Sequence, residues 1–170
     1  MLRSASTHMP TESFRVHVTK DYLTFSAAHF IAYPGFRERL HGHNYRVAIT
    51  LHGQLGPQGY VVDFGVVKKV ARRLCDRLDE RLLLPARSDC LEISEDGDGV
   101  TVGYEGDRFR FPQGDVLLLP IVHTSVEELA QYLAGELRRE LDAEGVGPLT
   151  AIEVAVEESF GQQAIYRRET

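Results

Sequence analysis

Two histidines separated by a single glycine, His41 and His43, form the pattern in this 170-residue chain that points most directly to chemistry. Successive side chains of a strand alternate between its faces, so on an extended chain both imidazoles would point to the same side. His29 lies twelve residues before His41, and turn-forming residues 33–35 lie between them, so a hairpin would bring three imidazoles together. Three neutral imidazoles suit a tetrahedral zinc ion with an open fourth position. For the two-histidine pattern alone, a pair of partly exposed loop histidines is an equally good interpretation.

The strands that must carry these histidines show alternating apolar and polar residues. Residues 14–19 alternate and continue through Phe25, and the alternation resumes over residues 44–55. Residues 150–157 alternate as cleanly, and residues 164–167 could return beside them. The sequence therefore predicts two pairs of antiparallel strands, with the histidines at the ends of the first pair.

Two amphipathic helices are predicted between these strand pairs. Asp63 can cap a helix whose apolar stripe reaches Leu78 and includes Cys75, which we expect to be buried and unreactive. Thr124 precedes Glu127 by three residues, which is the spacing of a capping box, and the apolar stripe of a second helix follows.

The length of the chain is typical of one domain. The order of its predicted elements, two strands, a helix, a second helix and two more strands, predicts an α+β fold with both helices on one face of an antiparallel sheet. Residues 1–13 are expected to form a flexible tail before a single domain over residues 14–170. The formal net charge of −6 argues against a nucleic-acid binder, and no apolar run reaches the roughly 20 residues of a membrane helix. Two cysteines are too few for a disulfide framework, so we expect a cytoplasmic protein.

Several of these stretches occur in the order typical of one family. Residues 25–29, 41–45 and 61–65 resemble the 6-pyruvoyltetrahydropterin synthase and 6-carboxytetrahydropterin synthase superfamily, and the resemblance continues through residues 78–79, 124–127 and 156–158. It implies a tunnelling fold assembled as a homohexamer, a dimer of trimers, and a pterin triphosphate substrate such as 7,8-dihydroneopterin triphosphate. Closing several open sheets into one barrel would also remove their unpaired edges.

One segment has no counterpart in the family's compact members, which pass more directly from the first helix to the second. Residues 85–120 contain short apolar stretches at 91–93, 100–102 and 108–111, separated by turn residues. We interpret this segment as a β-rich insertion between the helices, whose role the sequence does not reveal.

The resemblance also assigns residues to substrate binding. By position, Glu158 matches the glutamate that anchors the pterin, and a carboxylate can accept two parallel hydrogen bonds from a guanidine-like edge. Thr124 and Ser125 match the segment that lines the pterin pocket, and Glu127 could serve there too. A surface glutamate at a strand end and a simple helix cap are the alternatives for these positions.

The proton-transfer residues depart from the usual pattern. Arg37 stands where usual members have a cysteine, Glu80 stands where they have a histidine, and only Asp79 of that set remains. The chain instead resembles the branch in which a glutamate three residues before the HGH motif, here Glu38, replaces the cysteine. That branch cleaves the substrate side chain to 6-hydroxymethyl-7,8-dihydropterin for folate synthesis.

Cleavage of that kind requires removal of a hydroxyl proton, which a carboxylate can accept, so Glu38 is the predicted general base. The alternative for Glu38 is a loop residue paired with Arg37 or Arg39. His123 is a candidate for the missing proton donor because histidine titrates near neutral pH, although a structural role is as well supported.

Three functions remain open from the sequence. The first is a zinc-dependent lyase of the folate branch, and the second is a 6-carboxytetrahydropterin or 6-pyruvoyltetrahydropterin synthase with relocated proton-transfer residues. The third is a non-catalytic pterin-binding homologue, which the loss of the cysteine and histidine favours. The three imidazoles, Glu38 and Glu158 together favour an enzyme.

Overall fold

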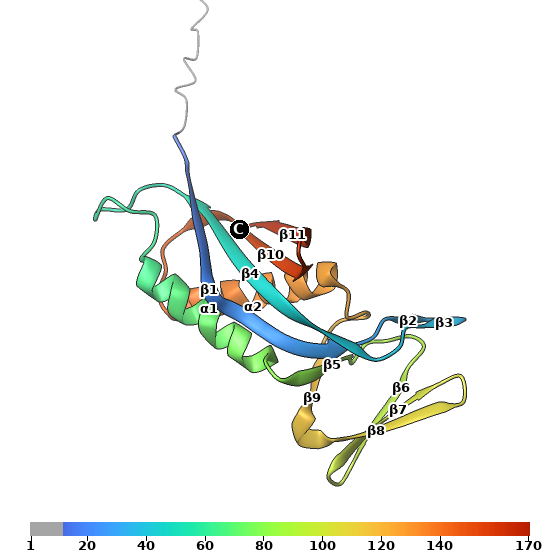
Figure 1. The fold of residues 1–170 in the computed structure, drawn as a ribbon. Coiled ribbons are helices and arrows are strands. Elements are labelled where there is room, and N and C mark those ends of the chain that lie inside the picture. The colour runs from blue at the N-terminus through green and yellow to red at the C-terminus, as the bar shows by residue number, and fades with distance from the viewer. Residues whose placement is uncertain (1–11) are drawn as a thin grey trace, which may run out of the picture.

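A sheet with two helices on one face forms the body of the chain (Figure 1). The structure is a computed structural model and describes residues 12–170, so nearly all of the tail expected over residues 1–13 lies outside the described residues. In chain order the elements are β1 (Phe14–His29), β2 (Ala32–Tyr33), β3 (Phe36–Arg37), β4 (His41–Gly53), α1 (Phe64–Leu78), β5 (Arg81–Pro85), β6 (Glu92–Asp96), β7 (Gly99–Tyr104), β8 (Asp107–Pro112), the 3-10 turn η1 (Gln113–Asp115), β9 (Val116–Leu119), α2 (Val126–Ala143), β10 (Leu149–Ser159) and β11 (Gln162–Glu169).

The two longest strands, β1 and β4, form the antiparallel pair at the centre of the sheet. Their register places His29 opposite His41 and Ala27 opposite His43, so the predicted hairpin does bring the histidine-bearing strand ends together. The register shifts between Thr19 and Thr24, which marks a bulge in β1. On the other side β10 pairs with β4 and β11 pairs with β10, both antiparallel, as the alternating residues predict.

The helices cover the face of the sheet to which the alternate apolar residues of β4 point. Tyr45, Val47, Ile49 and Leu51 are all buried, and they belong to the same core as the apolar stripes of α1 and α2. Cys75 lies in this core, as predicted. Burial raises the pKa of its thiol to about 12, so Cys75 stays protonated and acts as a small apolar residue.

The helix caps confirm one prediction and correct another. Asp63 caps α1 as predicted, and its carboxylate accepts a hydrogen bond from the backbone N–H of Gly65 at 2.6 Å. The prediction that Thr124 caps α2 is wrong, because the N-cap is Ser125, whose hydroxyl accepts from the N–H of Glu128 at 3.3 Å. Thr124 is fully buried, and its hydroxyl instead donates to the carbonyl of Phe30 at 3.0 Å.

Two short strands extend the antiparallel sheet in a way that the sequence did not indicate. β5 pairs parallel to β1, and β9 pairs parallel to β5, which completes the order β11-β10-β4-β1-β5-β9. Apart from Arg81 at the start of β5, both strands are continuous apolar runs without alternation, a pattern that does not distinguish a strand from a buried helix. Within residues 85–120, therefore, β9 belongs to the main sheet.

The rest of that segment forms a separate three-stranded antiparallel sheet, in the order β6-β7-β8, which we call the small sheet. It lies on the same side of the molecule as the β2–β3 hairpin, beyond the ends of β1 and β5 (Figure 1). A second apolar core joins it to the rest of the chain and includes Phe30, Leu82, Leu84, Val102 and Tyr104. The small sheet is thus packed against the residue that follows His29.

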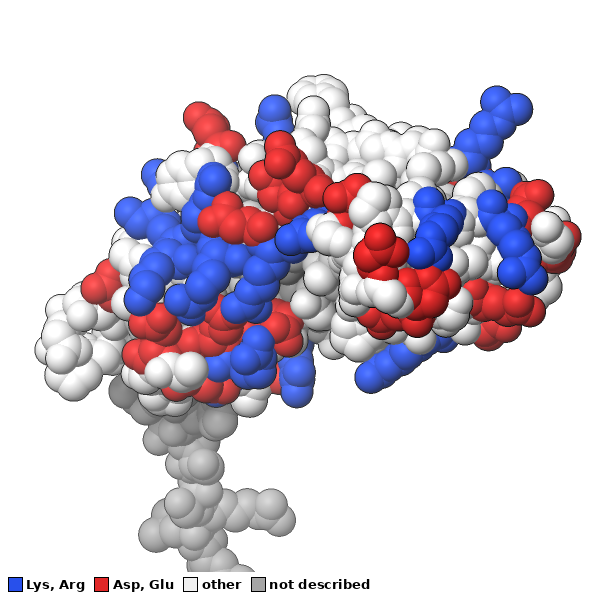
Figure 2. Space-filling model, turned by 90° about the horizontal axis from the view of Figure 1, so that it is seen from below, with Lys and Arg blue, Asp and Glu red and all other residues white. Residues whose placement is uncertain are grey.

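Charged side chains of both signs are interleaved on the face seen from below (Figure 2). Arg73 of α1 contacts the buried Glu140 of α2 at 2.5 Å, and Lys69 contacts Glu144 at 3.2 Å. Lys69 and Arg73 of α1 are therefore paired with acids at or near the end of α2. Within residues 12–170, no helix is both long and apolar enough to cross a membrane.

Candidate active site

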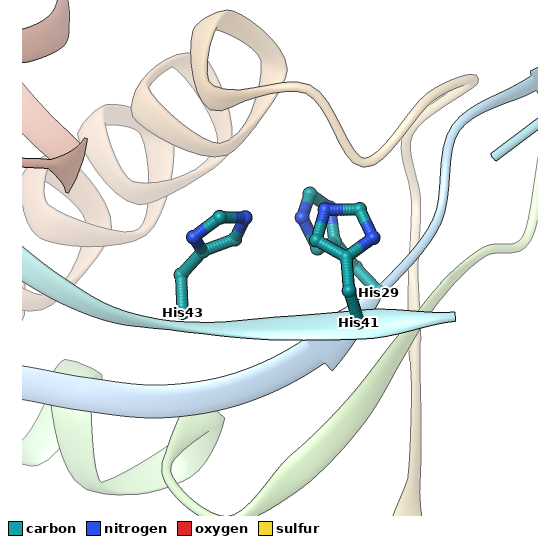
Figure 3. A group of neighbouring side chains, drawn as sticks. All are labelled: His29, His41 and His43. Carbon is teal, nitrogen blue, oxygen red and sulfur yellow. The ribbon is translucent and has the colours of Figure 1, made fainter. Parts of the chain in front are cut away.

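Three imidazole rings meet where β1 ends and β4 begins (Figure 3). His29 is the last residue of β1, and His41 and His43 are the first and third residues of β4, so the two-residue period of a strand puts them on one side. One nitrogen from each ring lies within 4.8 Å of the other two. The structure thus brings together the three predicted metal ligands.

Backbone carbonyls fix the orientation of two of these rings. His29 Nδ1 lies 2.9 Å from the carbonyl of Thr124, and His41 Nδ1 lies 2.7 Å from the carbonyl of Arg39. A carbonyl can only accept a hydrogen bond, so each Nδ1 carries the proton and each Nε2 presents a lone pair. Burial lowers the pKa of His29, which keeps that ring neutral, as a metal ligand must be.

The buried Nε2 of His29 shows that the cluster fits a cation. Among the described residues it has no hydrogen-bond partner, although Oε1 of Glu158 lies 3.3 Å away. A lone pair and a carboxylate oxygen repel each other at that distance unless a proton or a metal ion lies close to both. Because Nδ1 already holds the proton, a metal ion bound by Nε2 of His29, Nε2 of His41 and one ring nitrogen of His43 would remove this repulsion.

Glu158 lies at the rim of the cluster, on β10. Its Oε1 is 3.6 Å from Nε2 of His43 and accepts a hydrogen bond from the hydroxyl of Tyr45 at 3.4 Å. Burial, and then the charge of Glu158, raise the pKa of Tyr45, so the hydroxyl remains a donor. Glu158 is therefore more than a surface residue at a strand end.

Glu38 lies in the segment that leads from β3 into β4. Its Oε2 accepts a hydrogen bond from the N–H of Ile31 at 2.9 Å, and its own N–H donates to the carbonyl of Ile31 at 2.9 Å. Its charge also contributes to the raised pKa of Tyr45. Among the described residues, no ion pair joins the carboxylate of Glu38 to Arg37 or Arg39, and Arg37 donates to the backbone carbonyl of Glu38 instead.

Asp79 lies elsewhere in the chain, at the C-terminal end of α1. Its Oδ1 accepts a hydrogen bond from the N–H of Ser26 at 2.7 Å, and Glu80 donates to the Ser26 carbonyl at 2.7 Å. Ser26 is exposed between the buried Phe25 and Ala27, so its side chain points away from the histidine face. Within one chain, Asp79 is held by β1 and not by the histidine cluster.

The segment before α2 supports the cluster mainly through its backbone. The Thr124 carbonyl holds His29, Ser125 caps the helix, and Glu127 is exposed. His123 Nδ1 lies 3.1 Å from Oε1 of Glu128. The sequence did not lead us to predict that Glu128 lies next to a candidate site residue. The spacing of three residues from Ser125 to Glu128 is also that of a capping box, one residue beyond the predicted box, and could have drawn attention to Glu128.

Comparisons with known proteins agree with this geometry. A Methanocaldococcus jannaschii protein with the provisional name 6-carboxy-5,6,7,8-tetrahydropterin synthase is 35% identical over 86% of this chain and 90% of its own length. The crystal structure of 6-pyruvoyl tetrahydropterin synthase from Plasmodium vivax is 37% identical and superposes with a TM-score of 0.89, covering 94% of this chain and all of that one. The Plasmodium falciparum synthase gives a TM-score of 0.90 at 37% identity, with the same coverage. Two further P. vivax structures are described as catalytic residue mutants in which a glutamate is replaced by alanine or by cysteine.

These matches also settle the fold and the class of protein. The α+β arrangement is the predicted tunnelling fold, and a match over 94% of the chain includes most or all of the small sheet. The family model for 6-pyruvoyl tetrahydropterin synthase matches residues 17–169. The chain therefore belongs to the 6-pyruvoyl tetrahydropterin synthase family, an enzyme family of lyases that act on pterins.

Proposed function

We propose that the chain is a zinc-dependent lyase that cleaves the side chain of 7,8-dihydroneopterin triphosphate to give 6-hydroxymethyl-7,8-dihydropterin. The observation that carries the proposal is the carboxylate of Glu38, held on the N–H of Ile31 two residues beyond the metal-ligand candidate His29. The description of a glutamate as the catalytic residue of the P. vivax synthase supports a glutamate in this role.

Three imidazole nitrogens are a donor set typical of zinc, and we assign His29, His41 and His43 as its ligands. When bound, zinc would lower the pKa of a coordinated hydroxyl, as it does for water. Glu38 then accepts the hydroxyl proton, the adjacent carbon–carbon bond breaks as that oxygen becomes a carbonyl, and the electron pair moves toward the pterin ring. A proton delivered to the carbon on the pterin side completes the hydroxymethyl group.

Other residues of the site have proposed roles in binding and proton delivery. Glu158 anchors the guanidine-like edge of the pterin, and its described contacts all use Oε1, which leaves Oε2 for the substrate. Residues 124–127 line the pocket. His123 is the proposed proton donor, and Asp79 is the proposed member of the proton-transfer set that orients its neighbours. Because Asp79 is held at Ser26, we place it at a site completed by a second copy of the chain.

We also propose a cytoplasmic homohexamer built as a dimer of trimers. The strands β11 and β9 are the two edges of the main sheet, and pairing between copies would cover unpaired backbone groups there. Cys75 and Cys90 are free thiols, which suits a reducing compartment.

A product assay tests the proposed reaction. Zinc-loaded protein is incubated with 7,8-dihydroneopterin triphosphate, and the pterin product is identified by mass spectrometry. The proposal expects a pterin shortened by two carbons together with a triphosphorylated two-carbon aldehyde. A pterin that keeps all its side-chain carbons and has lost triphosphate would instead support a 6-pyruvoyltetrahydropterin synthase. A 6-carboxy product, formed with acetaldehyde, would support a 6-carboxytetrahydropterin synthase, the function that the name of the M. jannaschii protein favours. Tight binding without any turnover would support a non-catalytic pterin-binding protein.

A further inference from the structure

We infer that Arg37 is a positioning residue: the small sheet holds its guanidinium, and through it fixes the backbone of Glu38. The inference rests on the proposed function, because it takes Glu38 as the base whose position matters. It gives a role to the small sheet, which contributes no side chain to the histidine cluster.

Four contacts hold the guanidinium of Arg37. Its Nη1 donates to the backbone carbonyl of Glu38 at 2.8 Å, and its Nη2 lies 3.0 Å from Oδ2 of Asp107, the first residue of β8. The guanidinium carbon lies 4.8 Å from the ring centroid of Phe109, on the same strand, and 6.0 Å from that of Phe30. A planar cation stacked on an aromatic ring and bonded at both ends has one preferred position, so it can transmit the position of β8 to Glu38.

The side chain of Arg37, the last residue of β3, is largely buried. Its side chain is only 20% exposed, and among the described residues its buried Nε has no hydrogen-bond partner. A buried N–H without a partner reduces stability. The side chain is thus held where the contacts to Glu38 and to β8 require it, at a cost in hydration.

Two further hydrogen bonds join the same hairpin of the small sheet to the same segment. Oε1 of Glu105, in the β7–β8 turn, accepts from the N–H of Gly35 at 2.9 Å, and the hydroxyl of Tyr104 donates to the carbonyl of Tyr33 at 3.1 Å. Together with Arg37, they tie the β2–β3 hairpin to the β7–β8 hairpin at three points. The small sheet therefore contacts and positions the segment that leads to Glu38.

The far end of this chain of contacts is the Glu38 carboxylate on the N–H of Ile31. A base displaced by about 1 Å from its reacting proton can lose roughly a hundredfold in rate. If Arg37 holds the Glu38 backbone, its loss should loosen the bond to Ile31 and lower kcat while leaving KM and bound zinc unchanged. A merely structural arginine would leave the Ile31 bond intact.

The experiment compares Arg37→Met, Arg37→Lys and Asp107→Asn with a control from the same sheet, Arg110→Met. Arg110 lies on β8 but pairs with Asp96 and Asp98 inside the small sheet, so its loss disturbs the sheet without touching the loop. Two quantities are measured on zinc-loaded protein: the hydrogen-exchange rate of the Ile31 amide by NMR, and kcat and KM in the product assay. Asp107→Asn serves as the mild variant if Arg37→Met does not fold.

Arg37→Met removes the charge-assisted hydrogen bond from Arg37 to the backbone carbonyl of Glu38. We expect this loss to speed hydrogen exchange of the Ile31 amide by about tenfold. We also expect kcat to fall by about ten- to a hundredfold. Arg37→Lys and Asp107→Asn should fall between Arg37→Met and the unmodified protein, and Arg110→Met should match the unmodified protein. Unchanged Ile31 exchange in Arg37→Met would overturn the inference, as would an equal effect of Arg110→Met.

A double variant separates this inference from the proposed function. If Arg37 acts through Glu38, adding Arg37→Met to Glu38→Gln should lower the residual kcat no further. A further loss as large as in the single variant would overturn the inference. If Glu38→Gln alone kept full turnover, the proposed base would be wrong, and the exchange rate at Ile31 would still show whether Arg37 holds the loop.

Discussion

The chemistry of the three histidines is decided by atoms that belong to other residues. The carbonyls of Thr124 and Arg39 set the tautomers of His29 and His41, and this leaves both Nε2 lone pairs free. Partners of this kind orient metal-binding histidines and tune their affinity in many proteins. The side chains of Thr124 and Arg39 play no part in these bonds, so residue types alone do not indicate them.

The ligand assignment predicts a loss of zinc in His41→Ala. Removing one of three imidazoles should lower zinc affinity by about a hundredfold or more, since even the outer partners of metal-binding histidines contribute 10–100-fold. Zinc content after dialysis against a chelator, measured by plasma mass spectrometry, checks this. His17→Ala is the matched control, because His17 is exposed and its ring contacts Thr50 at 2.9 Å, away from the cluster. Equal zinc loss in both variants would contradict the assignment.

The proposed base predicts a selective loss of rate in Glu38→Gln. The amide keeps the shape of the side chain but accepts no proton, so kcat should fall by about 100- to 10,000-fold while zinc content stays the same. Steady-state kinetics with 7,8-dihydroneopterin triphosphate measure the change. Glu92→Gln, an exposed glutamate of β6, should behave as the unmodified protein. Full turnover by Glu38→Gln would rule out this base.

The proposed pterin anchor predicts a different kinetic signature in Glu158→Gln. A neutral amide cannot accept two charge-assisted hydrogen bonds, so KM should rise by about ten- to a hundredfold. Because Glu158 also contacts His29 and His43, zinc content is measured in the same samples. A raised KM with zinc retained supports the anchor, whereas a loss of zinc at unchanged KM would point to Glu158 as a metal partner.

At the scale of the elements, alternation of residue types predicted the strands that matter most for the site. Residues 14–25 and 44–55 alternate because one face packs on the helices, and that same alternation puts His41 and His43 on the helix side of β4. β5 and β9 escaped prediction because, apart from Arg81, both are apolar without alternation, a pattern shared by strands and by buried helix segments. The contacts of the β7–β8 hairpin with the loop before Glu38 escaped it as well, because they join residues about 70 positions apart.

The packing of α1 on α2 predicts that removing either of two acidic residues of α2 lowers the free energy of unfolding by different amounts. Glu140 is 5% exposed and contacts Arg73 and Arg77 of α1, so Glu140→Ala should lower the free energy of unfolding by about 1–3 kcal/mol. Asp142→Ala is the control, because its pair with Arg138 lies within α2 and is half exposed, and it should cost less than about 0.5 kcal/mol. Urea unfolding measures both. Equal changes in the free energy of unfolding would show that the ion pairs of Glu140 with α1 do not stabilise the packing of the two helices.

At the scale of the whole molecule, no contact within one chain joins Asp79 to Glu38 or to the histidine cluster among the described residues. The histidines lie on the helix side of the β1–β4 pair and Glu38 is bonded to the N–H of Ile31, whereas the carboxylate of Asp79 is bonded to the N–H of Ser26. If both residues serve the same reaction, a second copy of the chain can bring its Asp79 to the site. The family resemblance implied an oligomer, and this separation gives a physical reason for one.

Mixing two inactive variants tests whether copies share a site. Glu38→Gln chains and Asp79→Asn chains are unfolded, mixed in equal amounts and refolded with zinc, and the mass of the assembly is measured by native mass spectrometry. If each site takes Glu38 from one copy and Asp79 from another, random mixing leaves about a quarter of the sites with both residues intact, and about that share of the activity should return. If both residues serve the site of their own chain, every site keeps one defect and no activity returns. Each variant refolded alone provides the inactive baseline. Recovery of activity above that baseline in assemblies of six chains would support both the shared site and the hexamer.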